Sequence, residues 1–421
     1  MPDPHFHTRE EDLDRFRLLL KNLGNPHRQY PIIHIAGTKG KGSTAVMLAS
    51  ILRVSGLKVG LYTSPHLITV RERIRVDGRM VTKQQFASLI NRIRSGSNGM
   101  GDPEKIAYRT VFEHLTAAAF LHFSQMGADI AVVEAGLGGR LDATVVVDPI
   151  LSILTPIGLD HTDILGDTMS QIAADKAHII KPNIPVVSAE QHNDAIIEIR
   201  KRADKINAPL TIAHNKHNGL SLPLRGYFQQ NNLSTALTAL KELEPMGLLD
   251  DLLCDAINPE TVQRGLRNVR WLGRFQLIDD HPMIVLDGAH NDLAMRAIVE
   301  AITSSDGRYP SEWRVVLSAM RGKPLPEMLK TLSGHCVKFY LAPIRFPKGL
   351  SADELERISR NTGVDATVYR DIPTAFEAAR HETITNQLVL ATGSLYLVGE
   401  ILRHLRGLPL PPTDGKIDSR I

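Results

Sequence analysis

Residues 32–44 read IIHIAGTKGKGST, a short apolar run that passes directly into glycine, lysine and hydroxyl residues. The next residues, AVMLASIL at 45–52, have the composition of a buried helix. A strand, a glycine-rich turn and a helix in this order gather backbone N–H groups and a helix N-terminus around one small volume. Glycine lets the backbone approach a ligand closely, and Lys41 adds a positive charge. The stretch therefore predicts a phosphate-binding loop.

The loop departs from the common pattern GxxxxGK[ST], because Gly42 follows Lys41 where serine or threonine is usual. For these eight residues alone, a glycine-rich turn with two solvated lysines is the simpler alternative. The apolar run before the loop and the helical run after it favour nucleotide binding over that alternative.

Other apolar runs bounded by turn residues predict further strands, with helical stretches between them. Continuous apolar strands that alternate with helices are typical of a mostly parallel sheet covered on both faces. We expect an α/β fold, with a P-loop nucleotide-binding domain and a smaller C-terminal Rossmann-like α/β domain. The predicted strands are 31–36, 58–62, 129–134 and 150–154 in the first series, and 283–286, 314–317, 338–341, 366–369 and 387–391 in the second.

These two series of strands set the expected domain boundaries. The N-terminal nucleotide-binding domain is expected over residues 1–272 and the C-terminal domain over 282–406. WLGR at 271–274 predicts a hinge, and the linker between the domains is expected over 273–281. The tail at 407–421 is rich in proline and polar residues, so we expect it to be disordered.

The composition narrows the class of protein. Of the 421 residues, 43% are hydrophobic and 23% are charged, as in globular proteins. The net charge is only +3 and no long basic run carries interleaved aromatics, so we expect anionic small-molecule partners and no nucleic acid. We also expect a cytoplasmic protein with no membrane partner, because no run approaches the about 20 apolar residues of a membrane span. Cys254 and Cys336 lack metal-site spacing and are expected to be free, buried thiols.

Three polar residues follow predicted strands, at the edge where open α/β sheets bind ligands. Ser64 comes just after one strand, Glu134 ends another, and His161 follows a third. Taken singly, Ser64 before a proline is typical of a turn, and His161 of a hydrogen-bonded structural histidine. Glu134 is harder to explain in this way, because an unpaired charge at the end of an apolar strand is costly.

GTKGKGST at 37–44 resembles the phosphate loop of the Mur ligase superfamily, and its GKGS form is similar to that of the folylpolyglutamate synthase and dihydrofolate synthase family. More motifs follow in the family's order over about residues 10 to 403, so the chain is identified as a member. They are YTSPHL (62–67), ERI (72–74), EAGLGGRLDAT (134–144), GLDHT (158–162), DKAHIIKP (175–182), WLGRF (271–275), DGAHN (287–291) and GSLYLVGE (393–400).

The resemblance implies an ATP-dependent, ADP-forming ligase that joins L-glutamate to a folate or dihydropteroate carboxylate through an acyl phosphate. The family suggests a monomer whose partners are small molecules: ATP, L-glutamate and the folate or pteroate. Two alternatives stay open, a Mur-type amide ligase that acts on a non-folate carboxylic acid and an ATP-binding paralogue without turnover. The presence of Lys41, Glu134, His161 and Lys176 argues against the second alternative.

The resemblance also implies roles for matching residues. Ser64, Glu134 and His161 are implied to bind Mg²⁺, and Lys176 to be carbamylated to N6-carboxylysine. Carbamylation needs the neutral amine, which burial or a nearby cation favours. The implied catalytic residues are Lys41, Lys176 and His290. The implied ATP contacts are Gly37, Thr38, Gly40, Lys41, Gly42, Ser43, Thr44, Asn232, Arg274 and Asp287, and the implied substrate contacts are Thr110, Phe112, Glu113, Leu141, Asp142, Ala143 and Ser394.

The chain departs from the family's pattern at Val145, His178, Phe228 and Pro324, where the family usually has Asn, Gly, His and Asp. These departures concern the choice of acid more than the ligase chemistry. Asp287 has an alternative role, because an aspartate before a helical segment often caps the helix.

Overall fold

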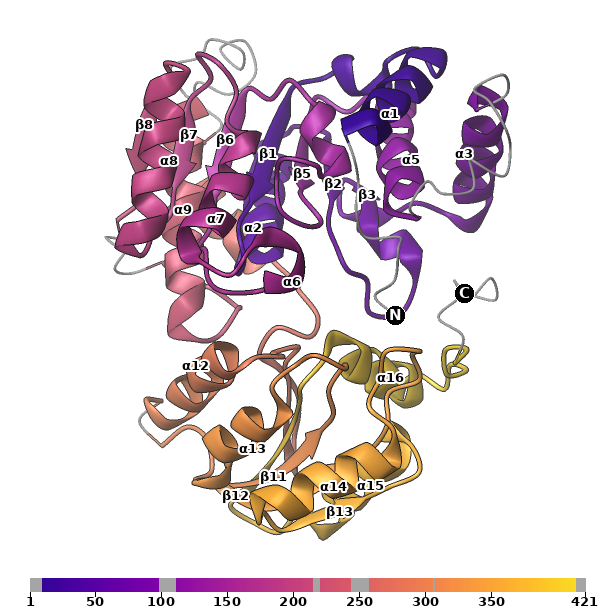
Figure 1. The fold of residues 1–421 in the computed structure, drawn as a ribbon, viewed down its shortest axis with the longest axis vertical. Coiled ribbons are helices and arrows are strands. Elements are labelled where there is room, and N and C mark those ends of the chain that lie inside the picture. Colours follow the sequence, from indigo (N-terminus) through magenta and orange to yellow (C-terminus); the bar gives the residue numbers. More distant parts are fainter. Residues whose placement is uncertain (1–9, 98–110, 215–219, 244–256, 306, 414–421) are drawn as a thin grey trace. The chain divides into compact units, whose positions relative to one another are not determined.

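The computed structural model describes residues 10–97, 111–214, 220–243, 257–305 and 307–413. The chain divides into two compact units. The first holds the residues up to Pro65, Arg71–Pro223 and Gln229–Val269, and the second holds His66–Val70, Leu224–Phe228 and the chain from Arg270 onward. Each unit is built around its own sheet (Figure 1). The expected α/β class, with one large and one smaller sheet, is confirmed.

The first unit contains an eight-stranded sheet in the order β4-β3-β2-β5-β1-β6-β7-β8. The strands from β2 to β8 in this order pair in parallel, whereas β3 and β4 add an antiparallel extension beyond β2. The four predicted apolar runs form the fully buried strands β1, β2, β5 and β6. The strands are β1 (Ile32–Ala36), β2 (Val59–Tyr62), β3 (Ile74–Val76), β4 (Arg79–Met80), β5 (Ile130–Glu134), β6 (Leu151–Leu154), β7 (Val186–Ser188) and β8 (Leu210–Ile212).

Helices cover this sheet by burying apolar faces. On one side, Ile172 of α7 and Ile199 of α8 join a core cluster with Leu154 of β6 and Val186 of β7. The helices are α1 (Glu10–Asn22), α2 (Lys41–Val54), α3 (Lys83–Gly96), α5 (Val111–Met126), α6 (Thr162–Leu165), α7 (Met169–Lys176), α8 (Asn193–Lys205), α9 (Tyr227–Leu243) and α11 (Pro259–Arg267), with short 3-10 turns at η2 (Pro26–Arg28), η3 (Val70–Arg73), η4 (Ala143–Val146) and η5 (Ala177–Ile179).

The second unit contains a six-stranded sheet in the order β13-β12-β11-β14-β10-β9, parallel except for β9. Alternate side chains of its central strands enter two separate cores. Val315 faces a cluster with α12, α13 and α14, whereas Val316 faces one with α15 and α16. The elements are β9 (Gln276–Asp280), β10 (Met283–Leu286), α12 (Asp292–Thr303), β11 (Glu312–Leu317), α13 (Leu325–Ser333), β12 (Cys336–Leu341), α14 (Ala352–Thr362), β13 (Ala366–Val368), α15 (Ile372–Glu382), β14 (Gln387–Thr392) and α16 (Leu395–Leu405).

Several sequence expectations differ in detail from the structure or fall outside it. Strand β9 occupies most of the expected linker at 273–281 and pairs with β10. Within the expected tail, the carbonyl oxygens of Pro409 and Pro411 accept hydrogen bonds from arginine side chains. Cys336 is a free, partly buried thiol, and burial raises its pKa to about 12, whereas Cys254 lies outside the described residues. Among the helices that the structure describes, none is long and apolar enough to cross a membrane.

Candidate active site

The order of the strands in the first sheet determines which residues meet. Strand β1 lies between β5 and β6, and all three run parallel. The phosphate loop after β1 therefore lies at the same sheet edge as Glu134, which ends β5, and Thr155, which follows β6. Ser64 follows β2, the other neighbour of β5. The topology thus brings together side chains that are far apart in the sequence.

The phosphate loop needs two of its glycines for conformation and for close contact. Gly37 has a φ of +146° and Gly40 a φ of +82°, values that residues with a side chain rarely adopt. A Cβ on Gly37 would overlap Thr155, and one on Gly40 would overlap the amide oxygen of Asn232. The loop is also tied to the segment after β6, because the backbone N–H of Thr38 donates to the carbonyl of Pro156 at 3.0 Å. Its shape is therefore fixed from two sides.

Two lysines converge on one carbonyl oxygen in this loop. The Nζ of Lys41, at the start of α2, donates to the Gly37 carbonyl at 3.1 Å, and the Nζ of Lys176, at the end of α7, donates to the same oxygen at 3.0 Å. Lys176 is only 5% exposed. Burial, reinforced by the charge of Lys41, lowers the pKa of Lys176 from 10.5 to about 7. Near neutral pH a large fraction of Lys176 is therefore the uncharged amine.

The first two residues of the predicted metal set are in contact, and the third lies on an exposed turn. The backbone N–H of Ser64 donates to a carboxylate oxygen of Glu134 at 3.0 Å, and Glu134 is 3% exposed. His161 precedes α6 with a φ of +51°, and its Nε2 lies 3.9 Å from a carboxylate oxygen of Asp160. Within the described residues, no group of three or more His, Cys, Asp and Glu side chains is placed to hold a metal ion by itself. A metal here would take the Ser64 hydroxyl and oxygens of a ligand as well.

Two buried polar atoms beside the loop have no hydrogen-bond partner among the described residues. They are the hydroxyl of Thr44, in the first turn of α2, and the amide nitrogen of Gln229, in α9. The oxygen of the Gln229 amide accepts a hydrogen bond from Asn232 at 3.0 Å. Buried polar groups in native proteins almost always have partners, so an orphan hydroxyl at a glycine-rich loop fits a phosphate or its metal ion.

The loop that follows β5 is braced by Asp142. One carboxylate oxygen of Asp142 accepts from the backbone N–H groups of Gly136 and Leu137, both at 2.9 Å. The other oxygen accepts from Thr144, whose hydroxyl also contacts the buried ring of His34 in β1 at 2.8 Å. Burial raises the pKa of Asp142, although these hydrogen bonds oppose the shift. Both oxygens are thus engaged within the protein.

The remaining predicted substrate residues of the first unit lie on both sides of this loop. The ring of Phe112 lies 5.7 Å from that of Tyr62 and would be struck by a Cβ on Gly136. Glu113 is buried in α5, and Ala143 is buried in η4. Leu141 is half-buried, and Thr110 lies outside the described residues.

The second unit places its predicted residues at the carboxyl ends of β10 and β14. Asp287 does not cap a helix. It accepts hydrogen bonds from the N–H groups of Phe275 and Ala289, both at 2.7 Å, and Asn291 caps α12 instead. Burial raises the pKa of Asp287, an effect that the charge of Arg274 opposes. Nδ1 of His290 lies 3.0 Å from the Gly288 carbonyl, and Ser394 caps α16 by accepting from the N–H of Tyr396.

The four departures from the family's pattern lie in different local environments. Nδ1 of His178 lies 2.9 Å from the Ala174 carbonyl, so this ring closes the end of its own helix. Phe228 packs against the apolar core of the second unit. Pro324 precedes α13, and Val145 is buried in η4.

Sequence reasoning missed Thr155 and Asp175, both of which support the loops. The hydroxyl of Thr155 donates to the Ala36 carbonyl at 3.3 Å, and Asp175 accepts a hydrogen bond from the N–H of Gly139 at 2.8 Å. A hydroxyl that ends an apolar strand is a weak signal for the first residue. The second adjoins Lys176 and has the appearance of a surface charge in the sequence.

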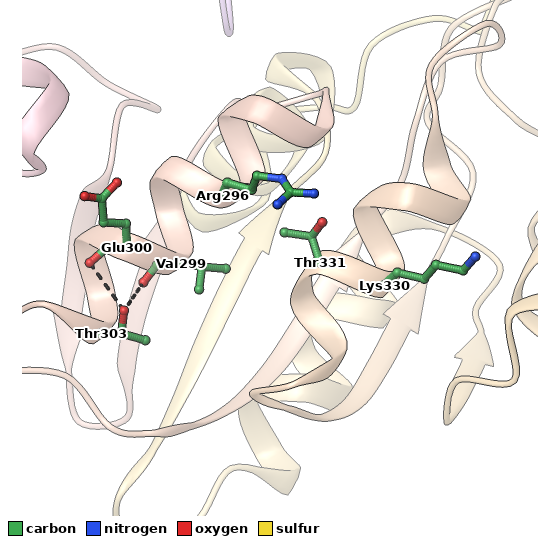
Figure 2. A pocket seen from close by; sticks show the side chains of 6 residues that line it. All are labelled: Arg296, Val299, Glu300, Thr303, Lys330 and Thr331. Atoms are coloured by element: carbon green, nitrogen blue, oxygen red, sulfur yellow. Dashed lines mark hydrogen bonds between the residues drawn. The ribbon is translucent and has the colours of Figure 1, made fainter.

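A surface hollow between α12 and α13 contains none of the predicted residues (Figure 2). Its one arginine is paired, because Nε of Arg296 lies 2.7 Å from Asp292 in the same helix. None of the residues that line the hollow is buried, so the hollow has no buried polar group that would favour a ligand. It is lined by Arg296, Val299, Glu300, Thr303, Lys330 and Thr331.

Comparisons with known proteins identify the family of this chain. The family model of the Mur ligase middle domain matches residues 35–221, and that of the Mur ligase glutamate ligase domain matches residues 273–395. The dihydrofolate synthase/folylpolyglutamate synthase of Bacillus subtilis is 32% identical over 418 residues, which span 94% of this chain and 95% of the relative. The folylpolyglutamate synthase of Lacticaseibacillus casei is 30% identical over 420 residues, which span 94% and 95%.

Solved structures of folylpolyglutamate synthase and dihydrofolate synthase proteins have the same fold as this chain. E. coli FolC in complex with DHPP and ADP superposes with a TM-score of 0.81 at 27% identity, covering 94% of this chain and 93% of that one. A bifunctional folylpolyglutamate synthase/dihydrofolate synthase with Mn, AMPPNP and L-glutamate bound gives a TM-score of 0.80 at 28% identity, covering 94% of both chains. This chain therefore belongs to the folylpolyglutamate synthase and dihydrofolate synthase family of Mur ligases.

Proposed function

We propose that this protein is an ATP-dependent, ADP-forming ligase that joins L-glutamate to the carboxylate of a folate or of dihydropteroate. The observation that carries the proposal is the phosphate loop itself. Two lysines converge on its Gly37 carbonyl, and the orphan hydroxyl of Thr44 lies in the helix turn that follows. Family membership over nearly the whole chain supports the same activity. The unit that carries the loop is the ATP-binding domain, and the second unit is the ligase domain.

The chemistry follows from the poor reactivity of a carboxylate, whose leaving group would be oxide. A carboxylate oxygen attacks the γ-phosphorus of ATP, the bond to the bridging oxygen breaks, and ADP leaves. The amine of glutamate then attacks the carbonyl carbon of the acyl phosphate. The carbon–oxygen bond to phosphate breaks and the amine loses a proton, which gives amide, ADP and inorganic phosphate. The protein must therefore hold two anions together and exclude water.

The loop residues bind and orient the nucleotide in this proposal. The backbone of residues 37–44 surrounds the phosphates, and Lys41 supplies positive charge to the phosphoryl group in transit. Asn232, whose amide packs on Gly40, contacts the adenine. In the ligase domain, Arg274 contacts the phosphates and Asp287 the ribose.

Ser64, Glu134 and His161 are the residues that would hold Mg²⁺. A hydroxyl, a carboxylate and an imidazole, completed by phosphate oxygens and water, suit a cation that retains part of its hydration shell. The ion would supply positive charge that reduces the repulsion between the acceptor carboxylate and the phosphates. The hydroxyl of Thr44, which has no partner among the described residues and lies in the first turn of α2, is a further oxygen that could bind the ion.

Lys176 is proposed to react with CO₂ to form N6-carboxylysine. Its neutral amine attacks the carbon of CO₂ and loses one proton to water, so that the ammonium beside Lys41 is replaced by a carboxylate. That change converts a repulsion between two cations on the Gly37 carbonyl into an attraction. Because the pKa of Lys176 is lowered to about 7, the amine is available for this reaction at neutral pH.

The acceptor acid is proposed to lie against the loop that Asp142 braces. Leu141 and Ala143 flank Asp142, and Phe112 offers an aromatic face beside Tyr62. Glu113 and Thr110 complete the set taken from the family's pattern. His290 and Ser394 are proposed to contact the incoming glutamate, because both follow strand ends of the ligase domain.

The direct test is ADP release by the purified protein with Mg-ATP and L-glutamate, with dihydropteroate and tetrahydrofolate in separate reactions. We expect release that requires both glutamate and one of the pterins, with a product heavier than the pterin by one glutamate residue. Glutamate-dependent release that no pterin stimulates would reject the folate assignment and indicate a different carboxylic acid.

Replacing Glu134 with glutamine keeps the shape of the side chain but removes its charge. We expect kcat to fall about 10²-fold, because the metal loses its one anionic protein ligand. Circular dichroism and thermal melting should show a folded protein, since the amide oxygen still accepts from the N–H of Ser64. Unchanged activity over a range of Mg²⁺ concentrations would remove Glu134 from the metal site.

A further inference from the structure

The chain leaves the first unit directly after Pro65 and returns to it at Arg71. The intervening residues, His66–Val70, belong to the second unit. Ile68 is buried in the core that α15 and α16 form, and Leu67 packs against the same core. Ser64, whose N–H contacts Glu134, lies only two residues before this docked segment. A predicted metal ligand of one unit is thus directly linked in sequence to a segment packed in the other.

The docked segment lies against α16 at a position where only glycine fits. A Cβ built on Gly399 of α16 would overlap the carbonyl oxygen of Leu67. A Cβ on Gly273 would lie 3.1 Å from Val398 and 3.3 Å from a methyl group of Leu67. Because two glycines contact Leu67, even one added methyl group at 399 must displace the segment.

A buried arginine of the same helix then holds the segment by its backbone. Arg403 is 4% exposed, and its Nη2 donates to the Ile68 carbonyl at 2.6 Å. Its Nη1 donates to the Pro409 carbonyl at 2.7 Å. A buried guanidinium is costly unless it makes such charge-assisted bonds, so these contacts are specific and hard to replace. Arg403 thereby joins α16, the docked segment and the chain that follows the helix.

We propose that Gly399 and Arg403 are positioning residues that hold residues 66–70 on α16 and, through them, set the position of Ser64 beside Glu134. Pro65 is the single residue between Ser64 and the segment, and its φ is fixed by the proline ring. A displacement of the segment is therefore expected to displace Ser64 as well. The inference rests on the proposed metal-binding role of Ser64. It adds that the last helix of the ligase domain controls the affinity of the ATP-binding domain for the metal.

The test uses two changes and two matched controls in the full chain. Gly399→Ala pushes on the Leu67 carbonyl, and Arg403→Gln removes the bond to the Ile68 carbonyl. Gly334→Ala is the glycine control, because Gly334 has an ordinary φ of −64° and no atom within 4 Å of its added Cβ. Arg406→Gln is the arginine control, because Arg406 is exposed in the turn that ends α16.

Two quantities that need no catalytic turnover are measured for each protein. The first is the rate of amide hydrogen exchange in residues 66–70. The second comes from the affinity for ADP measured over a range of Mg²⁺ concentrations, and is the Mg²⁺ concentration at which that affinity reaches half of its maximal value. We expect faster exchange in the segment and an about tenfold higher Mg²⁺ requirement for Gly399→Ala and Arg403→Gln. Neither control is expected to change. Arg403→Lys, which keeps the buried charge but cannot reach both carbonyls, should give a smaller shift and carries the test if the other variants fail to fold.

The outcomes separate this inference from the proposed function. Faster exchange in the segment with an unchanged Mg²⁺ requirement would overturn the inference while leaving the ligase assignment intact. A wild-type protein that binds ADP in a Mg²⁺-dependent way but turns over no pterin would contradict the assignment, and the same variants would still decide the inference. ADP binding that does not depend on Mg²⁺ in the wild type or in any variant would contradict both the inference and the ligase assignment.

Discussion

Replacing Lys41 with alanine is expected to lower kcat/KM for ATP by about 10³-fold. The Nζ of Lys41 lies at the mouth of the phosphate loop, 3.1 Å from the Gly37 carbonyl. It can therefore reach phosphate oxygens on which negative charge gathers during transfer. Lys176, which donates to the same carbonyl oxygen, cannot supply this charge once it is carbamylated as proposed.

The measurement is steady-state ADP release at several ATP concentrations. The matched control is Lys201→Ala, because Lys201 lies on α8 with 74% of its side chain exposed and lies 3.6 Å from Glu198. We expect this control to retain wild-type activity. A Lys41→Ala protein within tenfold of wild type would mean that the loop does not bind the transferred phosphate.

Replacing Lys176 with methionine is expected to abolish ligation and to stabilise the fold at the same time. Methionine fills a similar volume without a charge, so it avoids the cost of burying an ammonium group next to Lys41. That cost follows from the pKa, which is about 7 in the folded protein against 10.5 for an ordinary lysine. A shift of this size corresponds to several kcal/mol of unfolding free energy, and we expect a net gain of about 1–3 kcal/mol after the loss of the bond to Gly37.

The gain has a definite pH dependence. Because the folded-state pKa is the lower one, the unfolded chain binds more protons between pH 7 and pH 10.5. The penalty from Lys176 is therefore complete below pH 7 and fades as the pH rises toward 10.5. Urea unfolding of both proteins, measured without added bicarbonate, should show a larger difference at pH 6 than at pH 9. A difference that grows with pH would contradict the assignment.

The same lysine can be observed chemically. With ¹³C-bicarbonate, we expect a carbamate resonance in the NMR spectrum of the wild-type protein at pH 8 that weakens at pH 6 and is absent from the Lys176→Met protein. A carbamate signal that persists in the variant would place the modification on another amine.

The centre of the first sheet was predictable, because runs such as IAVV at 130–133 are apolar at every position and fit a strand covered on both faces. The edges were not. Strands β3 and β4 form a hairpin whose turn, Asp77–Gly78, has positive φ at both residues. An Asp-Gly pair is a known hairpin signal, but the flanking strands are too short to stand out. Strand β9 is only half-buried and mixes apolar with acidic residues, so it was expected to be part of a linker.

The sequence indicates which residues form the site better than it indicates which of them contact one another. The strand–loop–helix order indicates a phosphate loop without further information, and the ends of parallel strands indicate where Ser64 and Glu134 lie. The bond between Lys176 and Gly37 spans 139 positions, and nothing local in the sequence specifies it. The docking of residues 66–70 depends on the side chain that Gly399 lacks, and a missing side chain leaves no signal in a single sequence.

The central claim, ligation through an acyl phosphate, is tested most directly by isotope transfer. The acceptor pterin is prepared with ¹⁸O in its carboxylate and incubated with the protein, Mg-ATP and L-glutamate. The glutamylated product is then measured by mass, and the inorganic phosphate by ³¹P NMR. We predict one ¹⁸O atom in the phosphate for each amide formed, because the attacking carboxylate oxygen leaves with the phosphoryl group. A glutamylated product accompanied by unlabelled phosphate would contradict the mechanism, and the absence of any glutamylated product would contradict the function.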